Sequence, residues 1–162
     1  MRKGFSLTEL LVAVGILLLL TAMGVRWVGS ARDAAREREA QGFGREMTQA
    51  LQGALTEVSL SGLATNPHGW LWSQFPTGST TNRTGGTLTA SGNIRLCENP
   101  PTLTGLTTRF PRPPSYVGCA LHLITVQGSL TAPAQGTRVV GQRLEVHTWV
   151  KGRGRKVYVA GQ

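Results

Sequence analysis

One carboxylate lies within the longest apolar run of the chain. Glu9 comes shortly after the basic pair Arg2-Lys3, and residues 10–25 carry no charge at all. A carboxylate in such a segment is costly to insert into a membrane, so it usually marks a function and has a partner of opposite charge. We therefore expect Glu9 to form an ion pair that the chain needs for its function.

The apolar run has the length of a membrane-spanning helix. Counted from Phe5 it contains about the ~20 residues that cross a bilayer core, and Arg26-Trp27 follow it as an interfacial pair. A retained membrane helix is one hypothesis. The other is a secretory signal peptide that is cut near Thr21-Ala22-Met23-Gly24 and releases a soluble exported protein.

The residues around Glu9 carry a resemblance to a known family. The string Arg2-Lys3-Gly4-Phe5-Ser6-Leu7-Thr8-Glu9-Leu10 resembles the N-terminus of type IV pilins and pseudopilins. The resemblance covers about residues 1–30. It implies that a prepilin peptidase cuts after Gly4 and methylates the new N-terminal Phe5. It also implies that Glu9 pairs with the free amine of a neighbouring subunit, where the two charges offset each other's desolvation.

The same resemblance implies a location and a set of partners. The chain is expected in a bacterial inner membrane with a single pass, and afterwards in a periplasmic or surface filament. Its partners would be other pilin subunits, bound through the N-terminal helix, and the prepilin peptidase.

Two cysteines form the next candidate site. Cys97 and Cys119 are 22 positions apart, and in an exported domain such a pair is expected to form a disulfide. His122 stands at Cys-x-x-His spacing from Cys119, which raises zinc as an alternative. One such pair and a distant cysteine supply too few ligands for a structural zinc site, so we expect a disulfide, no metal and no cofactor.

A long helix is expected to position Glu9. An apolar helix over residues 5–30 would continue as an amphipathic helix over 31–60, with three glycines that allow a bend near residues 42–44. The apolar stripe of the second half repeats at spacings of three and four, as in a helix that packs on a sheet. Its members are Phe43, Met47, Ala50, Leu51, Ala54, Leu55 and Val58.

The remainder, residues 61–162, is expected to form a globular head. Turn residues predict a loop region over 61–93, in which Trp70, Leu71, Trp72 and Phe75 contact the core and residues 77–86 are exposed. Alternating residues predict strands over 87–90, 94–97, 103–108, 116–126, 138–150 and 156–160, with a turn at Gln127-Gly128. With a leader peptide over 1–4, this gives an α+β fold in which the long helix packs on an antiparallel sheet of about four strands. Pilins share that arrangement.

Charge excludes most enzyme classes. The net charge of +9 is concentrated in residues 61–162, where Glu98 and Glu145 are the two acids, and Asp33 is the one Asp of the chain. A catalytic triad or a carboxylate pair is therefore not expected. The histidines His68, His122 and His147 are scattered along the sequence and are expected to be structural or exposed.

The densest positive cluster is expected at a hairpin turn. Glycines there would let a phosphate approach, cations would release counterions, and flanking aromatic rings would stack on bases. The alternative is a solvated turn that protects the edge of the sheet. The candidate contacts for DNA or another anionic partner are Lys151, Arg153, Arg155, Lys156, Trp149 and Tyr158.

These features together predict a minor type IV pilin-like subunit rather than an enzyme. The first hypothesis is a pilus component used in DNA uptake, which the basic head favours. The alternative is a minor pseudopilin of a type II secretion system. A third hypothesis, a secreted enzyme or binding protein with an ordinary signal peptide, would instead need cleavage near Gly24 and a free soluble product.

Overall fold

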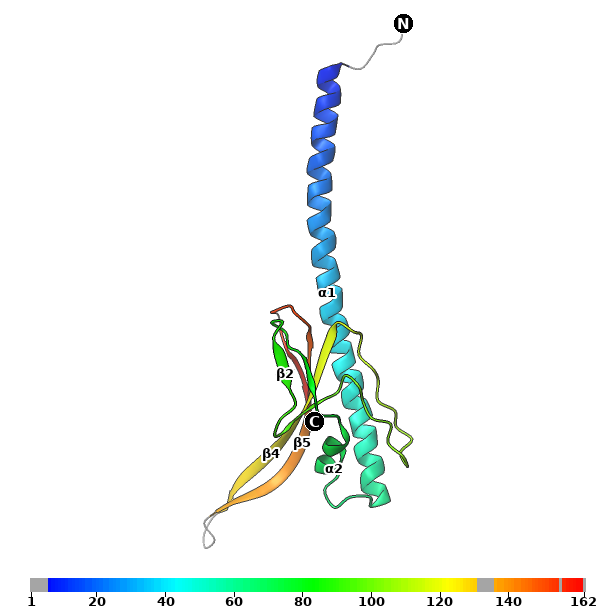
Figure 1. Cartoon of the computed structure of the whole chain (residues 1–162), viewed down its shortest axis with the longest axis vertical. Coiled ribbons are helices and arrows are strands. Elements are labelled where there is room, and N and C mark those ends of the chain that lie inside the picture. Colours follow the sequence, from blue (N-terminus) through cyan, green and yellow to red (C-terminus); the bar gives the residue numbers. More distant parts are fainter. Residues whose placement is uncertain (1–5, 131–135, 155, 162) are drawn as a thin grey trace. The chain divides into compact units, whose positions relative to one another are not determined.

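The structure is a computed structural model that describes residues 6–130, 136–154 and 156–161. It divides into two compact units, Met1–Arg36 and Glu37–Gln162. The second unit holds the core (Figure 1). The elements in chain order are α1 (Leu7–Ser61), α2 (Pro67–Gln74), β1 (Ser79–Thr81), β2 (Thr87–Thr89), β3 (Ile94–Leu96), β4 (Val117–Leu130), β5 (Gly136–Val150) and β6 (Tyr158–Gly161).

The long helix predicted from the sequence is confirmed as α1. Within the second unit its buried residues recur at spacings of three and four and contribute to the hydrophobic core. Of the predicted stripe, Ala50 is only half-buried, and Ala40 is buried in addition. Burying such side chains contributes roughly 1.5–3 kcal/mol for each large one. The buried members are Ala40, Phe43, Met47, Leu51, Ala54, Leu55 and Val58.

A glycine in α1 allows close contact with the sheet. The helix continues through Gly42 and Gly44, where the sequence allowed a bend. A Cβ at Gly44 would lie 3.2 Å from the Thr148 hydroxyl, which donates a hydrogen bond of 2.9 Å to the Ala40 carbonyl. This bond satisfies the one buried polar side chain of the described core, so Gly44 serves packing rather than flexibility.

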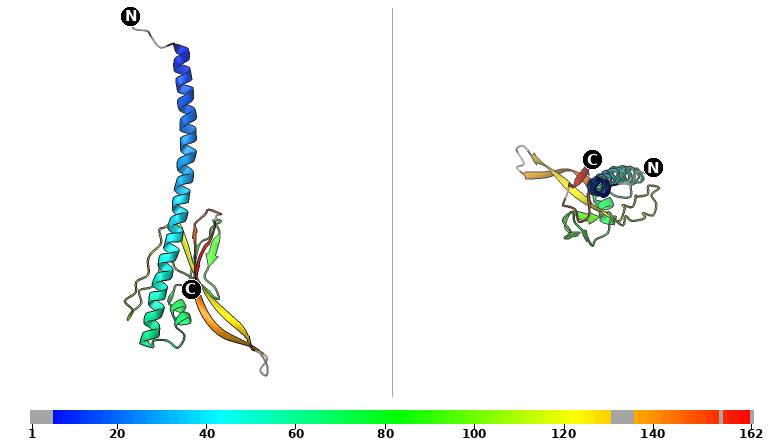
Figure 2. Two further views of the ribbon diagram at one scale, coloured as in Figure 1. Left: turned by 180° about the vertical axis from the view of Figure 1, so that it is seen from behind. Right: turned by 90° about the horizontal axis from the view of Figure 1, so that it is seen from above.

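The predicted antiparallel sheet is confirmed. Its four strands lie in the order β3-β4-β5-β6, and β1 pairs with β2 in a separate two-stranded sheet. The longest pairing joins β4 to β5, and Figure 2 shows this ribbon extending beyond the rest of the sheet. The fold is therefore α+β, with part of α1 against one face of an antiparallel sheet.

The two faces of β5 differ as alternation predicts. Leu144, Val146, Thr148 and Val150 are buried against the core, while Glu145 and His147 face outward and are half-buried. Trp149 shares this outer face but is only 3% exposed. Outward residues of β4 lie opposite them in the register.

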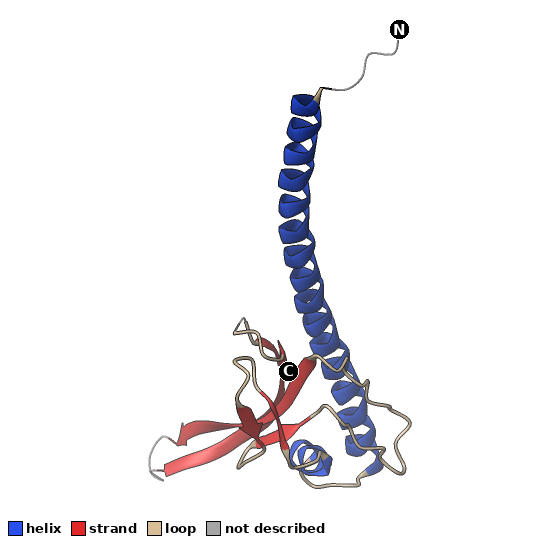
Figure 3. Cartoon of the chain, turned by 45° about the horizontal axis from the view of Figure 1, so that its top comes forward, coloured by secondary structure: helices blue, strands red, loops and turns tan. Residues whose placement is uncertain are grey.

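One predicted strand is wrong. Residues 103–108 form no strand and run beside α1, where Figure 3 shows them as loop. The carboxylate of Glu57 accepts hydrogen bonds of 2.6 Å from the Thr107 backbone N–H, the Thr107 hydroxyl and the Thr108 hydroxyl. The alternating pattern is real, but the backbone donor of Thr107 bonds to a helix side chain instead of a neighbouring strand.

We expect acid to weaken this contact. The Thr107 hydroxyl, followed by the Thr108 hydroxyl and the Thr107 N–H, holds the pKa of Glu57 below its ordinary value of 4.5, against a small opposing effect of burial. A carboxyl with a lowered pKa stabilises the fold above its ordinary pKa, and that stabilisation is lost as pH falls through the lowered value. Urea midpoints should therefore fall more on acidification from neutral pH to about pH 3 for the wild type than for Glu57→Gln. Equal losses in the two proteins would contradict the role of Glu57, and Glu46→Gln, an exposed glutamate of α1, is the matched control.

The predicted turn at Gln127-Gly128 is also wrong. Strand β4 continues to Leu130, with Gln127 opposite Val139 and Gly128 opposite Arg138. The register shifts between Val126 and Gln127, as in a β-bulge that absorbs an extra residue without ending the strand. A Gln-Gly pair therefore marks an irregularity in the ladder here.

The predicted loop region, residues 61–93, contains α2 and β1, which the sequence did not predict, besides β2, which falls within the predicted strand over 87–90. Asn66 caps α2 through its side chain, which accepts from the Gly69 N–H, and Pro67 occupies the first turn. This Asn-Pro start is common to turns and to helix N-termini, so the sequence alone does not distinguish the two. The predicted contact with the core is confirmed, because Leu71 and Phe75 are buried in it.

The predicted disulfide joins Cys97 and Cys119. Both residues are fully buried within the core. A bridge that closes a loop of this length contributes about 3 kcal/mol by reducing the entropy of the unfolded chain. Because Cys119 is bonded to Cys97, it does not offer a thiolate to zinc beside His122.

Candidate functional site

The first half of α1 is apolar and exposed. Leu10, Leu17 and Leu20 are each at least 60% exposed. The most apolar stretch of α1 has a mean hydropathy of 2.2 with none of it buried, and its length and composition are sufficient to cross a membrane. A surface of this size is stable only when lipid or other apolar chains cover it.

Glu9 lies in the first turn of this helix. The backbone N–H of Ser6 donates a hydrogen bond of 3.1 Å to the Glu9 carboxylate. Ser6-Leu7-Thr8-Glu9 thus has the spacing of a capping box and forms one half of it, in which the acid of the third helical residue returns to the N-cap, while the Ser6 hydroxyl lies 2.7 Å from the Thr8 hydroxyl. Sequence reasoning missed this role, although the Ser-x-x-Glu spacing is visible in the string. The carboxylate therefore has a local contact as well as the intermolecular one that we expect.

The basic turn after β5 is held by the head. Lys151 is half-buried, and its ammonium lies 2.9 Å from the carboxylate of Glu98, which also accepts a hydrogen bond from the Thr80 hydroxyl. Gly152 has a positive φ of 69°, as the tight turn requires. Its N–H donates to the Asn82 carbonyl at 3.2 Å. One of the predicted contact cations is thus engaged in an internal ion pair.

The two aromatic residues of the predicted cluster also have internal partners. The indole N–H of Trp149 donates to the Thr81 carbonyl at 3.0 Å, and the Tyr158 hydroxyl lies 3.2 Å from the Glu37 carboxylate. The Trp149 ring is buried, so it packs the head rather than offering an open face. Arg153 and Lys156 are exposed, and Arg155 lies outside the described residues.

The N-terminal segment matches a known family model. Residues 1–25 match the model described as Prokaryotic N-terminal methylation motif. The chain carries a type IV pilin-like N-terminus. Comparison with curated proteins and with solved structures found no match. The resemblance seen in the sequence is therefore confirmed for this segment.

The two residues that are predicted to be processed come just before α1 in the sequence. Gly4 and Phe5, the predicted cleavage and methylation positions, lie outside the described residues. Ser6 precedes the helix, which begins at Leu7. The motif thus implies processing by a prepilin peptidase next to an apolar helix that is suited to membrane anchoring before assembly.

Two of the histidines that are scattered in the sequence meet on the outer face of the sheet. The rings of His122 and His147 stack with centroids 4.0 Å apart and planes 16° apart. Glu145 lies 3.3 Å from His147 and forms an ion pair of 2.6 Å with Arg143. Burial lowers the pKa of His122, the charge of His147 lowers it further, and Glu145 opposes both. Sequence spacing missed this pair, because it depends on the β4–β5 register.

Proposed function

We propose that the chain is a minor type IV pilin-like subunit of a pilus or pilus-like filament, one that takes part in DNA uptake. The observation that carries this proposal is the methylation motif over residues 1–25, which includes the exposed apolar start of α1. A prepilin peptidase would remove the leader, residues 1–4, and methylate Phe5. Residues 5–30 would then form the membrane and filament segment, 31–60 its amphipathic continuation, and 61–162 the head.

Assembly needs a partner for the acid inside the apolar segment. Cleavage after Gly4 creates an ammonium on Phe5, and the Glu9 of an adjacent subunit would supply the opposite charge. Each group offsets the cost of burying the other. The exposed apolar surface of α1 supports this role, since the helices of neighbouring subunits would cover it after it leaves the lipid.

A minor pseudopilin of a type II secretion system is the alternative. Both kinds of subunit use the same leader, so the N-terminus does not separate them. The head favours the first, because residues 61–162 contain ten cations and two acids. Both described acids are paired with cations, Glu98 with Lys151 and Glu145 with Arg143. The remaining charge suits an anionic partner such as DNA.

The proposed role is structural and needs no cofactor. The subunit would first reside in a bacterial inner membrane with a single pass, and later in a periplasmic or surface filament. Its partners would be sister pilins, the peptidase and, at the head, DNA.

Mass spectrometry of the mature N-terminus tests the proposal. In protein purified from the native cell, we expect the chain to begin at Phe5 and to carry an N-methyl group. A control expressed without a prepilin peptidase should keep residues 1–4. A native chain that begins near Gly24 would contradict the proposal and indicate a soluble exported protein.

A further inference from the structure

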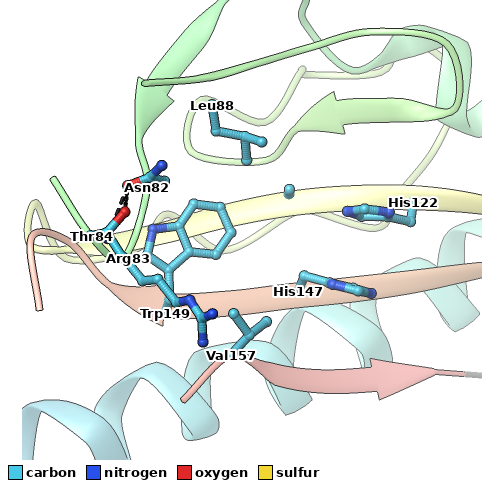
Figure 4. A pocket seen from close by; sticks show the side chains of 9 residues that line it. Asn82, Arg83, Thr84, Leu88, His122, His147, Trp149 and Val157 are labelled. Atoms are coloured by element: carbon cyan, nitrogen blue, oxygen red, sulfur yellow. Dashed lines mark hydrogen bonds between the residues drawn. The ribbon is translucent and has the colours of Figure 1, made fainter. Parts of the chain in front are cut away.

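A pocket of about 380 Å³ lies on the outer face of the sheet. His122 and His147 contribute to it from β4 and β5, and Trp149 forms part of its wall (Figure 4). Leu88 of β2 and Arg83 of the β1–β2 connection line the pocket from the separate two-stranded sheet. The pocket is far larger than a bare phosphate and falls in the range of about 300–1,000 Å³ that small organic ligands occupy.

Hydrogen bonds fix the connection that carries Arg83. The Asn82 side chain accepts from the Thr84 N–H at 2.9 Å and from the Gly86 N–H at 2.8 Å. The Asn82 carbonyl accepts from Gly152 in the basic turn. Arg83 is therefore held at the rim of the pocket by a preorganised turn, next to the turn that carries the exposed Arg153.

The pocket has the charge of an anion site. No carboxylate lines it among the described residues. Arg83 is exposed and has no hydrogen-bond or ion-pair partner in the described ranges. A guanidinium offers five N–H donors in a fork that matches phosphate oxygens.

The floor of the pocket suits a flat ring. The imidazoles of His122 and His147, which stack on each other, line the pocket together with the apolar side chains of Leu88 and Val157. Burial, followed by the charge of His147, lowers the pKa of His122, which favours the uncharged imidazole at this position. Stacking contributes roughly 1–3 kcal/mol for each base in proteins that bind single strands.

We propose that this pocket binds one nucleotide unit of a single nucleic-acid strand, with its phosphate on Arg83 and its base against the histidine pair. The inference rests on the DNA-related function proposed above and assigns it to a defined site. It also shifts the predicted contact from Lys151, which has an internal partner, to Arg83 and the histidine pair, which the sequence did not predict to bind a ligand.

Binding to a short oligothymidylate tests the site. The full chain, in micelles of a neutral detergent, is titrated with the labelled strand at about 0.1 M salt and followed by fluorescence anisotropy. Arg83→Gln should weaken binding about tenfold, because it removes a charge-assisted contact. The matched control is Arg112→Gln, which also removes one exposed head arginine and should change binding less than about twofold, as expected for a distant charge. Equal effects of the two variants would overturn the site.

Competitors identify the ligand class. Thymidine monophosphate should displace the strand at concentrations where inorganic phosphate does not, and equal displacement by phosphate would overturn the nucleotide assignment. A duplex of the same length should bind more weakly, because its bases are stacked, and equal or tighter duplex binding would contradict a base in the pocket. Anionic phospholipid vesicles that bind through Arg83, with no binding of the strand, would reassign the pocket to lipid.

The strand-binding experiment and the analysis of the mature N-terminus test the two proposals separately. Failure of strand binding in a chain that still carries N-methyl-Phe5 overturns only the pocket. An unmethylated chain that starts near Gly24 overturns the filament function, whatever the strand binding shows.

Discussion

Glu9→Gln should leave the chain processed and inserted in the membrane, but should lower its incorporation into filaments roughly a hundredfold. Removing one partner of a buried ion pair leaves an uncompensated charge, which costs about 3 kcal/mol or more. That cost corresponds to about two factors of ten in an equilibrium constant. The ratio of the subunit in sheared filaments to that in membranes, measured by immunoblot, gives the result.

Glutamine is the informative substitution because of the capping box. Gln at the third helical position also bonds back to the N-cap N–H, so Glu9→Gln keeps the contact to Ser6 and removes only the charge. Ser6→Ala makes the complementary change, since it removes the hydroxyl that contacts Thr8 and keeps both the Glu9 carboxylate and the backbone N–H that donates to it. Ser6→Ala should therefore incorporate nearly as well as the wild type.

A second control tests whether the effect depends on the position of the carboxylate or only on the loss of one negative charge. Glu46→Gln removes one exposed carboxylate from the described second half of α1 and should leave incorporation unchanged. Normal incorporation of Glu9→Gln would remove the ion pair from the proposal and assign Glu9 to helix capping alone.

Gly118→Ala should destabilise the head by about 3 kcal/mol, at the upper end of the range for an overpacked core. Gly118 lies opposite Trp149 in the β4–β5 pairing, and a Cβ there would overlap the indole ring. The ring has little room to move, because it is buried and its N–H is bonded to Thr81. Urea unfolding of the full chain in neutral detergent, followed by tryptophan fluorescence, measures the loss.

The same sheet offers a matched control and a double-mutant cycle. Gly141 of β5 has no atom within 4 Å of an added Cβ, so Gly141→Ala should stay within about 0.5 kcal/mol of the wild type. In a Trp149→Ala background, Gly118→Ala should lose most of its effect and give a coupling energy of about 2 kcal/mol. Additive losses would show that the overlap with the indole is not the cause.

Interactions between segments explain the differences from the sequence predictions. Residues 103–108 alternate as a strand does, but Glu57 from α1 takes the backbone N–H of Thr107. The basic turn resembles an open contact surface in the sequence, but Glu98, 53 positions away, neutralises Lys151. The sequence shows which groups can donate or accept a hydrogen bond. It does not show which distant group each of them will bond to in the folded chain.

The spacing of apolar residues along the chain was sufficient to predict much of the fold. The three-and-four spacing from Phe43 to Val58 predicted the face that α1 buries, because helical geometry alone places those side chains together. Alternation predicted the faces of β5 for the same kind of reason. The N-terminal motif was also readable, since the residues predicted to be processed lie within a few positions of Glu9, whereas the capping role of Glu9 was not predicted.

The set of residues that line the pocket, by contrast, depends on the tertiary structure. His122 and His147 stack only because the β4–β5 register sets Ala120 opposite His147 and His122 opposite Glu145. Arg83 reaches the same space because Asn82 bonds to a turn that lies 70 residues later in the chain. The sequence by itself determined the pilin-like N-terminal motif, the apolar first half of α1 and the faces that α1 and β5 bury, since these depend on neighbouring residues. The pairing of distant strands and turns, which depends on packing across the whole head, decided which cations and rings meet.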